Sequence, residues 1–316
     1  MKIVMLDTAT LGSDMEFSVL KKYGEVTEYP QTTPENAAER TEMADVVILN
    51  KVKANEESLK NAKSLKLICV TATGFDNVDL DYCRKNGIAV CNVKGYSTDS
   101  VAQLTAAMAL SLVTHLPSFD KYVKDKSYTK SGLHNCLTPV FHEISGMTWG
   151  IVGMGEIGRK TAQIAGAFGA RVIAYSRTVR NDAEYTDIED LCRRSDIISL
   201  HVPLNEGTKN LISRERIALM KKSAVLINAA RGAVMDEKAA ADAIIENKIG
   251  GLGVDVFSTE PMQSDSPYNR LLDRDNVILT PHMAWGAYEA RRRCIEEIAE
   301  NINAFFNTGE RRNRVV

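Results

Sequence analysis

The spacing of hydrophobic residues along the chain predicts short strands that alternate with helices. In the first third, apolar runs at residues 3–6, 44–49, 66–70 and 88–93 predict strands, and residues 16–23 predict an intervening helix. The same alternation resumes after residue 148, with strands predicted at residues 171–176, 196–202, 224–229, 251–256 and 276–280. Because this alternation is typical of parallel sheets covered by helices, we expect an α/β protein with two doubly wound parallel-sheet domains.

Two longer helical patterns stand apart from this alternation. Residues 101–116 are apolar on almost every side, which is more than one face packed on one sheet explains. We therefore expect a helix that connects the domains and also forms a subunit interface, which predicts a homodimer. Residues 288–306 form a long amphipathic pattern after the second sheet, and a return of this helix to the first domain is compatible with the sequence.

A glycine-rich turn joins a predicted strand at residues 148–152 to a helical pattern that ends at residue 169. Gly153 permits the tight turn, Gly155 lets the backbone approach a pyrophosphate, and Gly158 lets helix and strand pack closely. The helical face and the strand that follow supply the context that a lone glycine motif lacks. This context favours a dinucleotide cofactor over the alternative interpretation, an ordinary glycine-rich turn.

Composition and charge narrow the classes of partner. The 316 residues suffice for two domains, and 44% hydrophobic with 25% charged residues is the balance of a soluble globular protein. A net charge of -2 favours neither nucleic acid nor an anionic membrane as partner. The most basic run, Arg291 to Arg293, is interpreted as a solvated helix face.

Cysteine usage and the N-terminus bear on the compartment. The six cysteines lack CxxC pairs and several lie in apolar runs, which predicts reduced, mostly buried thiols. A strand pattern begins at Lys2 and leaves no room for a signal peptide, and no apolar run reaches about 18 residues. We therefore expect a cytoplasmic protein. We predict no metal-binding residues.

Three polar residues of the second half each follow a predicted strand, where ligands of α/β sheets bind. Arg231 is suited to binding a carboxylate or polarising a carbonyl, and His282 carries protons at physiological pH. Glu260 precedes a proline in a loop. Taken singly, the arginine equally suits a salt bridge, the glutamate an exposed loop and the histidine a structural role. Together, beside a nicotinamide, they predict carbonyl reduction.

With these motifs in place, the chain resembles the D-isomer-specific 2-hydroxyacid dehydrogenases over essentially its whole length. The matching motifs follow in order at residues 72–79, 152–158, 201–204, 228–232, 255–261 and 280–282. The resemblance implies a dinucleotide-binding Rossmann domain at residues 99–284. It implies a discontinuous, flavodoxin-like substrate domain at residues 1–98 and 285–316.

The resemblance also implies roles for individual residues. Arg231 would bind the substrate carboxylate and carbonyl, His282 would be the acid/base and Glu260 would pair with it. Reduction would take a hydride from the nicotinamide and a proton from His282. Implied substrate contacts are Lys51, Thr73, Gly74, Arg231 and His282, with the backbone of Thr73 and Gly74 at the carboxylate. Implied cofactor contacts are Gly153, Met154, Gly155, Glu156, Ile157, Gly158, Ser176, Arg177, Thr178, His201, Val202, Pro203, Thr208, Ala229, Ala230, Arg231, His282 and, at the nicotinamide carboxamide, Asp255.

Within the family, the runs at residues 50–52, 72–77 and 101–103 are most similar to the glycerate dehydrogenase or hydroxypyruvate reductase branch. The expected substrates are small 2-oxo and D-2-hydroxy acids, with hydroxypyruvate, D-glycerate and glyoxylate as leading candidates. Two alternatives stay open. One is a dehydrogenase of bulkier 2-oxo acids, and the other is a nicotinamide-sensing binding protein without significant turnover.

The chain departs from the family pattern at the expected adenosine ribose site. The family usually has an aspartate or glutamate after the second cofactor-domain strand, whereas this chain has Ser176, Arg177 and Thr178. A carboxylate there repels a 2′-phosphate, while these side chains can hydrogen-bond or neutralise one. We therefore expect NAD(P)(H) as cofactor, with NADP(H) tolerated or favoured. In the alternative interpretation Arg177 stacks over the adenine and either cofactor fits.

Overall fold

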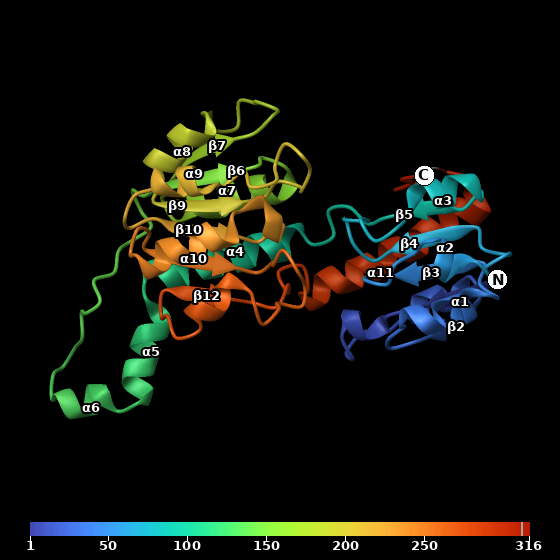
Figure 1. Ribbon diagram of the computed structural model, residues 1–316, viewed down its shortest axis with the longest axis horizontal. Helices are drawn as coiled ribbons and strands as arrows, with labels where there is room; N and C mark the ends of the chain where they lie inside the picture. Colours follow the sequence, from blue (N-terminus) through green and yellow to red (C-terminus); the bar gives the residue numbers. More distant parts are fainter. Residues whose placement is uncertain (311) are drawn as a thin grey trace. The chain divides into compact units, whose positions relative to one another are not determined.

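Two units make up the chain, and the computed structural model describes residues 1–310 and 312–316 (Figure 1). Unit 1 comprises Met1–Ser97 and Gly286–Val316, and unit 2 comprises Thr98–Trp285. The chain passes from one unit to the other twice, after Ser97 and after Trp285. Each of these crossings lies within one residue of an expected domain boundary, after residue 98 or 284. Each unit has its own sheet and its own hydrophobic core.

Unit 1 is built on a five-stranded parallel sheet of β1 (Lys2–Met5), β2 (Glu25–Glu28), β3 (Val46–Leu49), β4 (Leu67–Val70) and β5 (Ala89–Cys91). The strand order is β2-β1-β3-β4-β5, the order of flavodoxin-like folds. The four strands predicted in this part of the chain correspond to β1, β3, β4 and β5. Strands β3 and β4 are buried along their whole length, as is typical of parallel strands covered on both faces.

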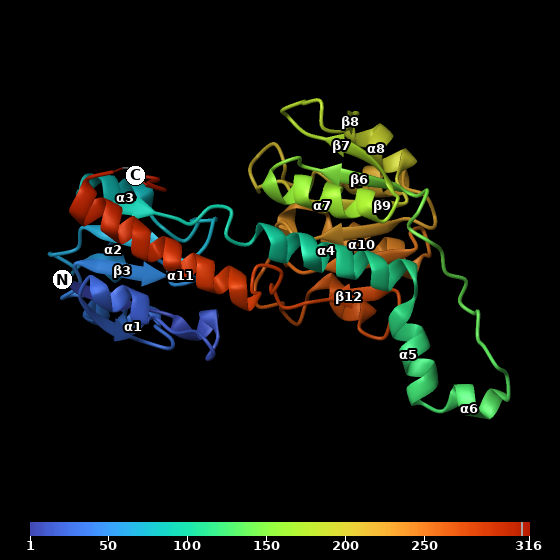
Figure 2. The same cartoon turned by 180° about the vertical axis from the view of Figure 1, so that it is seen from behind.

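Helices cover both faces of the unit 1 sheet. Alternate strand residues face opposite sides, so Val4, Val47 and Ile68 share one core with Leu59. Figure 2 shows the long helix of the C-terminal segment across the other face, where it packs on β4. The helices are α1 (Pro34–Thr41), α2 (Glu56–Leu59), α3 (Leu80–Lys85) and α11 (Tyr288–Asn303), with short turns at Thr8–Leu11, Ser18–Lys22 and Ala304–Thr308.

Two sequence expectations for unit 1 need correction. The helix expected at residues 16–23 is only a short 3-10 turn, Ser18–Lys22. Strand β2 was not expected, because its exposed Glu25 and Glu28 hide the apolar alternation of a strand. Short strands with charged side chains at the edge of a sheet disfavour pairing with other chains.

The basic run at the start of α11 is not the solvated face expected from the sequence. Only Arg292 is exposed. Arg291 donates to the carbonyl oxygen of Gly286 at 2.9 Å and pairs with Asp14. Arg293 donates to the carbonyl oxygen of Tyr96 through Nε at 3.1 Å and Nη2 at 3.0 Å. Two arginines of α11 therefore hold the backbone of unit 1 at the ends of both crossings.

Unit 2 is built on a seven-stranded parallel sheet of β6 (Thr148–Val152), β7 (Arg171–Tyr175), β8 (Glu184–Tyr185), β9 (Ile197–Leu200), β10 (Val225–Asn228), β11 (Gly251–Val254) and β12 (Val277–Leu279). The order is β12-β11-β10-β9-β6-β7-β8. Counted from β6, this is the Rossmann order with one further strand, and it reverses between β6 and β9. The predicted class, two doubly wound parallel sheets, is confirmed, although the two-residue β8 was missed.

Helices pack on both faces of the unit 2 sheet, and two lie outside it. The face that holds Trp149 and Ile151 is covered by α4 (Thr98–Val113) and α7 (Glu156–Ala167). The opposite face is covered by α8 (Ile188–Arg194), α9 (Arg214–Ala218) and α10 (Glu237–Ile245). The two outlying helices are α5 (Leu116–Lys124) and α6 (Ser127–Ser131), and 3-10 turns lie at Gly232–Val234 and Pro267–Leu271.

Helix α4 does not extend to residue 116, and its apolar surface does not require a second subunit. It ends at Val113, and His115 adopts a left-handed φ of 50° before α5 begins. Most apolar residues of α4 are buried against α7 and the strands β10 to β12, for example Met108 and Leu112. The structure therefore accounts for this helix within unit 2, contrary to the reasoning from its sequence.

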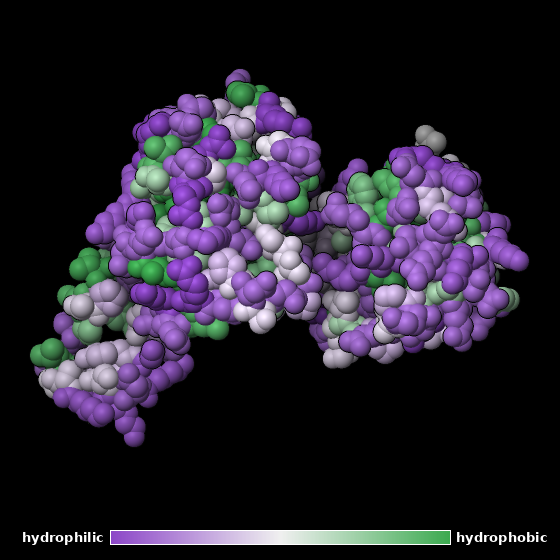
Figure 3. All heavy atoms as spheres, in the orientation of Figure 1, coloured by the Kyte–Doolittle hydropathy of each residue, from purple (hydrophilic) through white to green (hydrophobic). Residues whose placement is uncertain are grey.

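Exposed apolar residues occur instead on the segment that follows α4, residues 116–141, here called the arm. Figure 1 shows α5 and α6 of the arm projecting away from the sheet of unit 2, and Figure 3 shows hydrophobic surface along it. Leu133 and Leu137 are each 65% exposed and Val140 is 69% exposed. The arm contributes no buried residue to the core of unit 2.

The described residues also bear on membranes and on the cysteines. No helix in residues 1–310 and 312–316 is long and apolar enough to span a membrane. All six cysteines are free, and all but the half-buried Cys136 are buried, so the prediction of free, mostly buried thiols is confirmed. Burial raises the pKa of Cys83, Cys91 and Cys192 to about 11, which keeps these thiols protonated and unreactive near neutral pH.

Candidate active site

The glycine turn lies at the end of β6, beside the reversal of strand order. Gly153 has a left-handed φ of 101°, which disfavours any other residue. A Cβ on Gly158 would collide with the carbonyl oxygen of Gly153, so only glycine permits this approach of α7 to the turn. At Gly155, by contrast, a Cβ would meet no atom within 4 Å. Open space therefore lies at the N-terminus of α7, where a pyrophosphate fits the unpaired backbone N–H groups.

The side chains expected at the adenosine ribose follow β7. Ser176 is half-buried, and Arg177 and Thr178 are exposed. No hydrogen bond or ion pair to another described residue engages these three side chains. The structure thus leaves a hydroxyl and a guanidinium available at the end of the second strand of the Rossmann order.

The half-buried His201, which directly follows β9, ends a chain of hydrogen bonds that begins in the core. The Trp149 indole N–H donates to Ser199 Oγ at 3.0 Å, and Ser199 Oγ lies 3.0 Å from His201 Nε2. Burial lowers the pKa of His201 to about 4, so the ring is neutral near pH 7. Its Nδ1 is buried without a partner among the described residues. Farther along the same loop, Thr208 donates to the carbonyl oxygen of Pro203 at 2.6 Å and thereby braces it.

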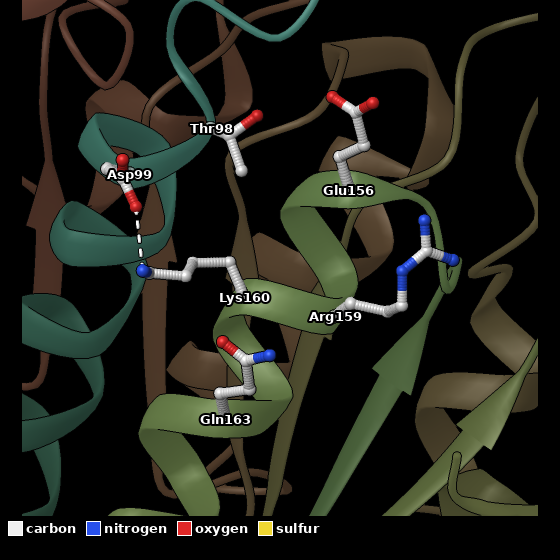
Figure 4. Close-up of a pocket in the computed structure, with 6 residues that line it drawn as sticks. All are labelled: Thr98, Asp99, Glu156, Arg159, Lys160 and Gln163. Carbon is white, nitrogen blue, oxygen red and sulfur yellow. Dashed lines mark ion pairs between the residues drawn. The ribbon is translucent and has the colours of Figure 1, made fainter.

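A polar hollow of about 380 Å³ lies against the outer face of α7, next to the glycine turn. Figure 4 shows side chains of α4 and α7 around it, with Lys160 directed at Asp99. The Lys160 Nζ lies 2.9 Å from Asp99 Oδ1, which ties the start of α4 to α7. The remaining lining residues are Thr98, Glu156, Arg159 and Gln163.

Arg231 lies in a turn after β10 that its neighbours hold tightly. The buried Asn228 accepts from the N–H of Ala230 at 3.1 Å and donates to the carbonyl oxygen of Arg231 at 3.0 Å. A Cβ on Gly232 would collide with the backbone of Phe257 and the next residue, so glycine lets this turn approach the loop after β11. The half-buried guanidinium has no acidic partner within ion-pair distance among the described residues. An unpaired, partly buried cation favours binding of an anion.

His282 and Glu260 come together from the ends of β12 and β11. The His282 Nδ1 lies 2.6 Å from Glu260 Oε2, and Glu260 Oε1 accepts from the N–H of Phe257 at 3.1 Å. Because a carboxylate only accepts hydrogen bonds, His282 donates through Nδ1 and its Nε2 is left for a ligand. His282 also has a left-handed φ of 52°, a strained conformation that often marks functional residues.

Asp255, at the end of β11, holds the turn that carries His282. It is fully buried, and burial raises the pKa of its carboxyl group. Its oxygens accept from the Thr280 hydroxyl at 2.6 Å and from the N–H groups of Met283 and Ala284 at 2.9 Å each. The sequence did not indicate this positioning role. Contact between Asp255 and the nicotinamide carboxamide stays a prediction.

Lys51, an expected substrate contact in unit 1, lies on a loop after β3 that a carboxylate holds in place. The buried Asp7 accepts from the N–H groups of Asn50, Lys51 and Val52, the shortest bond being 2.6 Å to Lys51. Burial raises the pKa of Asp7, and these bonds oppose that rise. Since Asp7 occupies the backbone N–H of Lys51, only the exposed side chain of Lys51 is available to a ligand.

Thr73 and Gly74 follow β4 at the neighbouring strand end of unit 1. The Thr73 hydroxyl donates to the carbonyl oxygen of Val93 at 2.8 Å. The backbone N–H groups of Thr73 and Gly74 have no acceptor among the described residues. Two adjacent unpaired N–H groups are suited to a carboxylate.

The structure thus brings Glu260 and His282 into direct contact and gives Arg231 a turn next to the loop of Glu260. The remaining substrate residues lie in unit 1. Sequence reasoning missed the supporting residues Asp7, Asn228 and Ser199. Each is a polar residue within or just after an apolar strand pattern, a signal that could have drawn attention to them.

The sequence is similar to known proteins that agree with this architecture. Residues 106–284 match the family described as D-isomer specific 2-hydroxyacid dehydrogenase, NAD binding domain. The glycerate dehydrogenase of Methylorubrum extorquens is 36% identical over 308 residues, which cover 96% of this chain and 96% of that enzyme. The glyoxylate reductase of Thermococcus litoralis is 39% identical over 272 residues, 84% of this chain and 81% of that enzyme.

A solved structure extends the likeness to the whole fold. The D-lactate dehydrogenase of Aquifex aeolicus, complexed with NAD and lactic acid, superimposes with a TM-score of 0.85 at 33% identity, over 100% of this chain and 99% of that one. The chain belongs to the D-isomer specific 2-hydroxyacid dehydrogenase family. It is an oxidoreductase with a Rossmann-type NAD-binding domain, most similar to the glycerate dehydrogenase and hydroxypyruvate reductase branch.

Proposed function

We propose that this protein reduces small 2-oxo acids, hydroxypyruvate or glyoxylate, to D-2-hydroxy acids, with Arg231, Glu260 and His282 as its catalytic residues. The observation that carries the assignment is the 2.6 Å contact between His282 Nδ1 and Glu260 Oε2. Relatives named glycerate dehydrogenase, glyoxylate reductase and hydroxypyruvate reductase support the substrate class.

His282 is the proton donor in this proposal. Its Nδ1–H is donated to Glu260, so Nε2 carries the proton that reaches the substrate oxygen. The nicotinamide, when bound, would supply the hydride that is added to the carbonyl carbon, and the only proton added is the one that His282 donates to the oxygen. The carbonyl thereby becomes a secondary alcohol, and His282 is left neutral until it takes up a proton again.

Arg231 binds the substrate anion. Its guanidinium has several N–H donors, of which Nη1 donates to the carbonyl oxygen of Ala230 at 2.8 Å. The others are free to hold the carboxylate and to oppose the negative charge that develops on the carbonyl oxygen. In unit 1, the unpaired N–H groups of Thr73 and Gly74 and the ammonium of Lys51 are our proposed partners of the substrate carboxylate.

Kinetics of single variants test the catalytic assignment. We expect His282→Ala to lower kcat about a hundredfold or more, because only the reacting state needs the proton. Arg231→Ala should also raise KM, since the arginine binds both ground state and transition state. The surface variants Arg193→Ala and His142→Ala serve as controls. Near wild-type turnover of hydroxypyruvate and glyoxylate by both site variants would overturn the assignment.

For the cofactor we propose that NADPH is accepted at least as well as NADH. Ser176 and Arg177 would contact the 2′-phosphate, each contact contributing about 1 to 3 kcal/mol. Ser176→Asp should shift the preference in kcat/KM towards NADH about tenfold or more, because its carboxylate repels the phosphate. Asn181→Asp, which adds the same charge farther along the loop, should leave the preference unchanged. Strong NADH selectivity that Ser176→Asp does not alter would contradict the proposal.

For the assembly we propose a homodimer in which the arm contacts a second copy of this chain. The exposed Leu133, Leu137 and Val140 lie close together in sequence, and Phe141 packs edge-on against Phe119 at 5.7 Å. Monomeric soluble proteins rarely expose so many large apolar side chains within one segment. Homodimers cover such segments with the same surface of the partner.

For the location we propose the cytoplasm, since free thiols are typical of reducing compartments.

A further inference from the structure

Three hydrogen bonds join the segment Ala72–Gly74 to Asn92 and Val93. The N–H of Val93 donates to the carbonyl oxygen of Ala72 at 3.0 Å, and the Thr73 hydroxyl donates to the carbonyl oxygen of Val93 at 2.8 Å. The third bond runs from Asn92 Nδ2 to the carbonyl oxygen of Thr73 at 2.7 Å. The segment is therefore fixed to the chain just after β5.

The bond from Asn92 acts on one particular peptide group. The carbonyl of Thr73 and the N–H of Gly74 belong to the same planar, trans peptide, so they point in opposite directions. When Asn92 holds the carbonyl, the N–H of Gly74 is turned away from Asn92, towards the side where it has no acceptor among the described residues. A hydrogen bond to the carbonyl also polarises the peptide and makes its N–H a stronger donor.

Asn92 is itself held by two further asparagines. Asn301 of α11 donates through Nδ2 to the carbonyl oxygen of Asn92 at 3.1 Å, and Asn313 donates through Nδ2 to Asn301 Oδ1 at 3.0 Å. The N–H of Asn92 in turn donates to the carbonyl oxygen of Asn313 at 3.2 Å. Asn92 and Asn301 are each 1% exposed. The C-terminal residues and α11 are thus connected to Thr73 through buried amides.

The balance of donors and acceptors at Asn92 is unusual. Its Oδ1 is buried and accepts no hydrogen bond among the described residues, although burial of an unpaired amide oxygen is costly. Only the Nδ2 donor is used. The one hydrogen bond of the Asn92 side chain to another described residue is therefore the bond to the Thr73 carbonyl oxygen.

We propose that Asn92 is a positioning residue for substrate binding, which aims and strengthens the Gly74 N–H as a donor to the carboxylate of a 2-oxo acid. Asn301 and Asn313 hold Asn92 in the orientation that this requires. The inference rests on the proposed function, because it takes Thr73 and Gly74 as the carboxylate site.

Steady-state kinetics with glyoxylate and direct titration of NADH test the proposal. In Asn92→Ala we expect KM for glyoxylate to rise about tenfold, with kcat changed less than about threefold and the Kd of NADH unchanged. Asn301→Ala should raise KM in the same direction by a smaller factor and covers the case in which Asn92→Ala fails to fold. The matched control is Asn86→Ala, because Asn86 also donates through Nδ2 to a backbone carbonyl, that of Tyr82 at 2.9 Å.

A second measurement does not depend on turnover. Amide hydrogen exchange of the ligand-free protein should be about tenfold faster at Val93, whose N–H donates to the carbonyl oxygen of Ala72, in Asn92→Ala than in wild type, and unchanged there in Asn86→Ala. An unchanged KM together with unchanged exchange would overturn the proposal. So would parallel losses in kcat, KM and NADH affinity, which indicate a general structural defect. If wild type reduces no 2-oxo acid, the proposed function fails, and the exchange comparison alone decides whether Asn92 fixes this segment.

Discussion

At the scale of single residues, the site combines side chains of two kinds. Arg231, Glu260 and His282 present groups that suit them to chemistry, and each follows a strand pattern that the sequence made visible. The residues that hold them could not be predicted in the same way. Asp255 acts on a turn 25 to 29 residues farther along the chain, and such pairings depend on strand order. The glycine turn was predictable because all three glycines act within one local motif.

His201 gives the residue scale its prediction of pH dependence. Burial lowers its pKa in the folded state to about 4, whereas the unfolded value is about 6.5. Between these values the unfolded chain binds the additional proton, so the free energy of unfolding falls as pH decreases from about 6.5 to about 4. We expect His201 to account for a loss of about 2 kcal/mol between about pH 7 and about pH 5.

Urea unfolding at these two pH values measures this effect. His201→Gln should reduce the acid-induced loss by about 2 kcal/mol relative to wild type. His142→Gln is the control, because His142 is exposed and should titrate alike in both states. Equal pH dependence in wild type and His201→Gln would contradict the neutral, buried assignment of this ring.

At the scale of elements, helix α11 does more than cover a sheet. Its sequence indicated an amphipathic helix with a basic, solvated end, and the pattern alone could not reveal which arginines bind backbone carbonyls. Arg293 binds Tyr96, next to one crossing between the units, and Arg291 binds Gly286, at the other. On the unit 2 side, the pair of Asp99 and Lys160 fixes the start of α4. Side-chain bonds therefore fix the residues that flank both crossings within their own units.

Substitution of single arginines of α11 distinguishes the contribution of an arginine that binds a backbone carbonyl from that of an exposed arginine. Arg293→Met should lower the free energy of unfolding by about 1 to 2 kcal/mol, because it removes a charge-assisted bond to a backbone carbonyl. Arg292→Met should change it by less than about 0.5 kcal/mol, since Arg292 is exposed and its contact with Glu296 is long, 3.6 Å. Urea unfolding measures both, and equal effects would show that the bond to Tyr96 contributes nothing specific.

At the scale of the whole molecule, the alternation of strands and helices was sufficient to predict two doubly wound sheets. What the sequence could not supply were the charged edge strand β2, the two-residue β8 and the true position of the exposed apolar surface. Helix α4 was expected to need a second subunit, but α7 and the sheet cover it. Burial within a fold and burial within an assembly leave the same apolar pattern in a sequence.

The arm yields the prediction for the assembly. Wild type should be a dimer at micromolar concentration, and the double variant Leu137→Asp with Val140→Asp should be a monomer, because two charges cannot be buried against the partner. Leu272→Asp is the matched control, as Leu272 is 63% exposed elsewhere in unit 2. Light scattering distinguishes the states. A monomeric wild type, or a double variant that remains dimeric, would contradict the proposed role of the arm.

The pairing of the C-terminal residues with β5 has a consequence for the solubility of the protein. Strand β5 is the last in its sheet, and such a strand presents a row of open N–H and C=O groups. The N–H of Val315 donates to the carbonyl oxygen of Val90 at 2.7 Å, and Cys91 forms an antiparallel bridge with Arg314. These residues thereby occupy the edge on which a strand from another molecule could be added. A variant that ends before residue 313 would expose the edge of β5, a buried, apolar strand, as a template for intermolecular β-sheet. We therefore expect such a variant to aggregate more readily than the wild type.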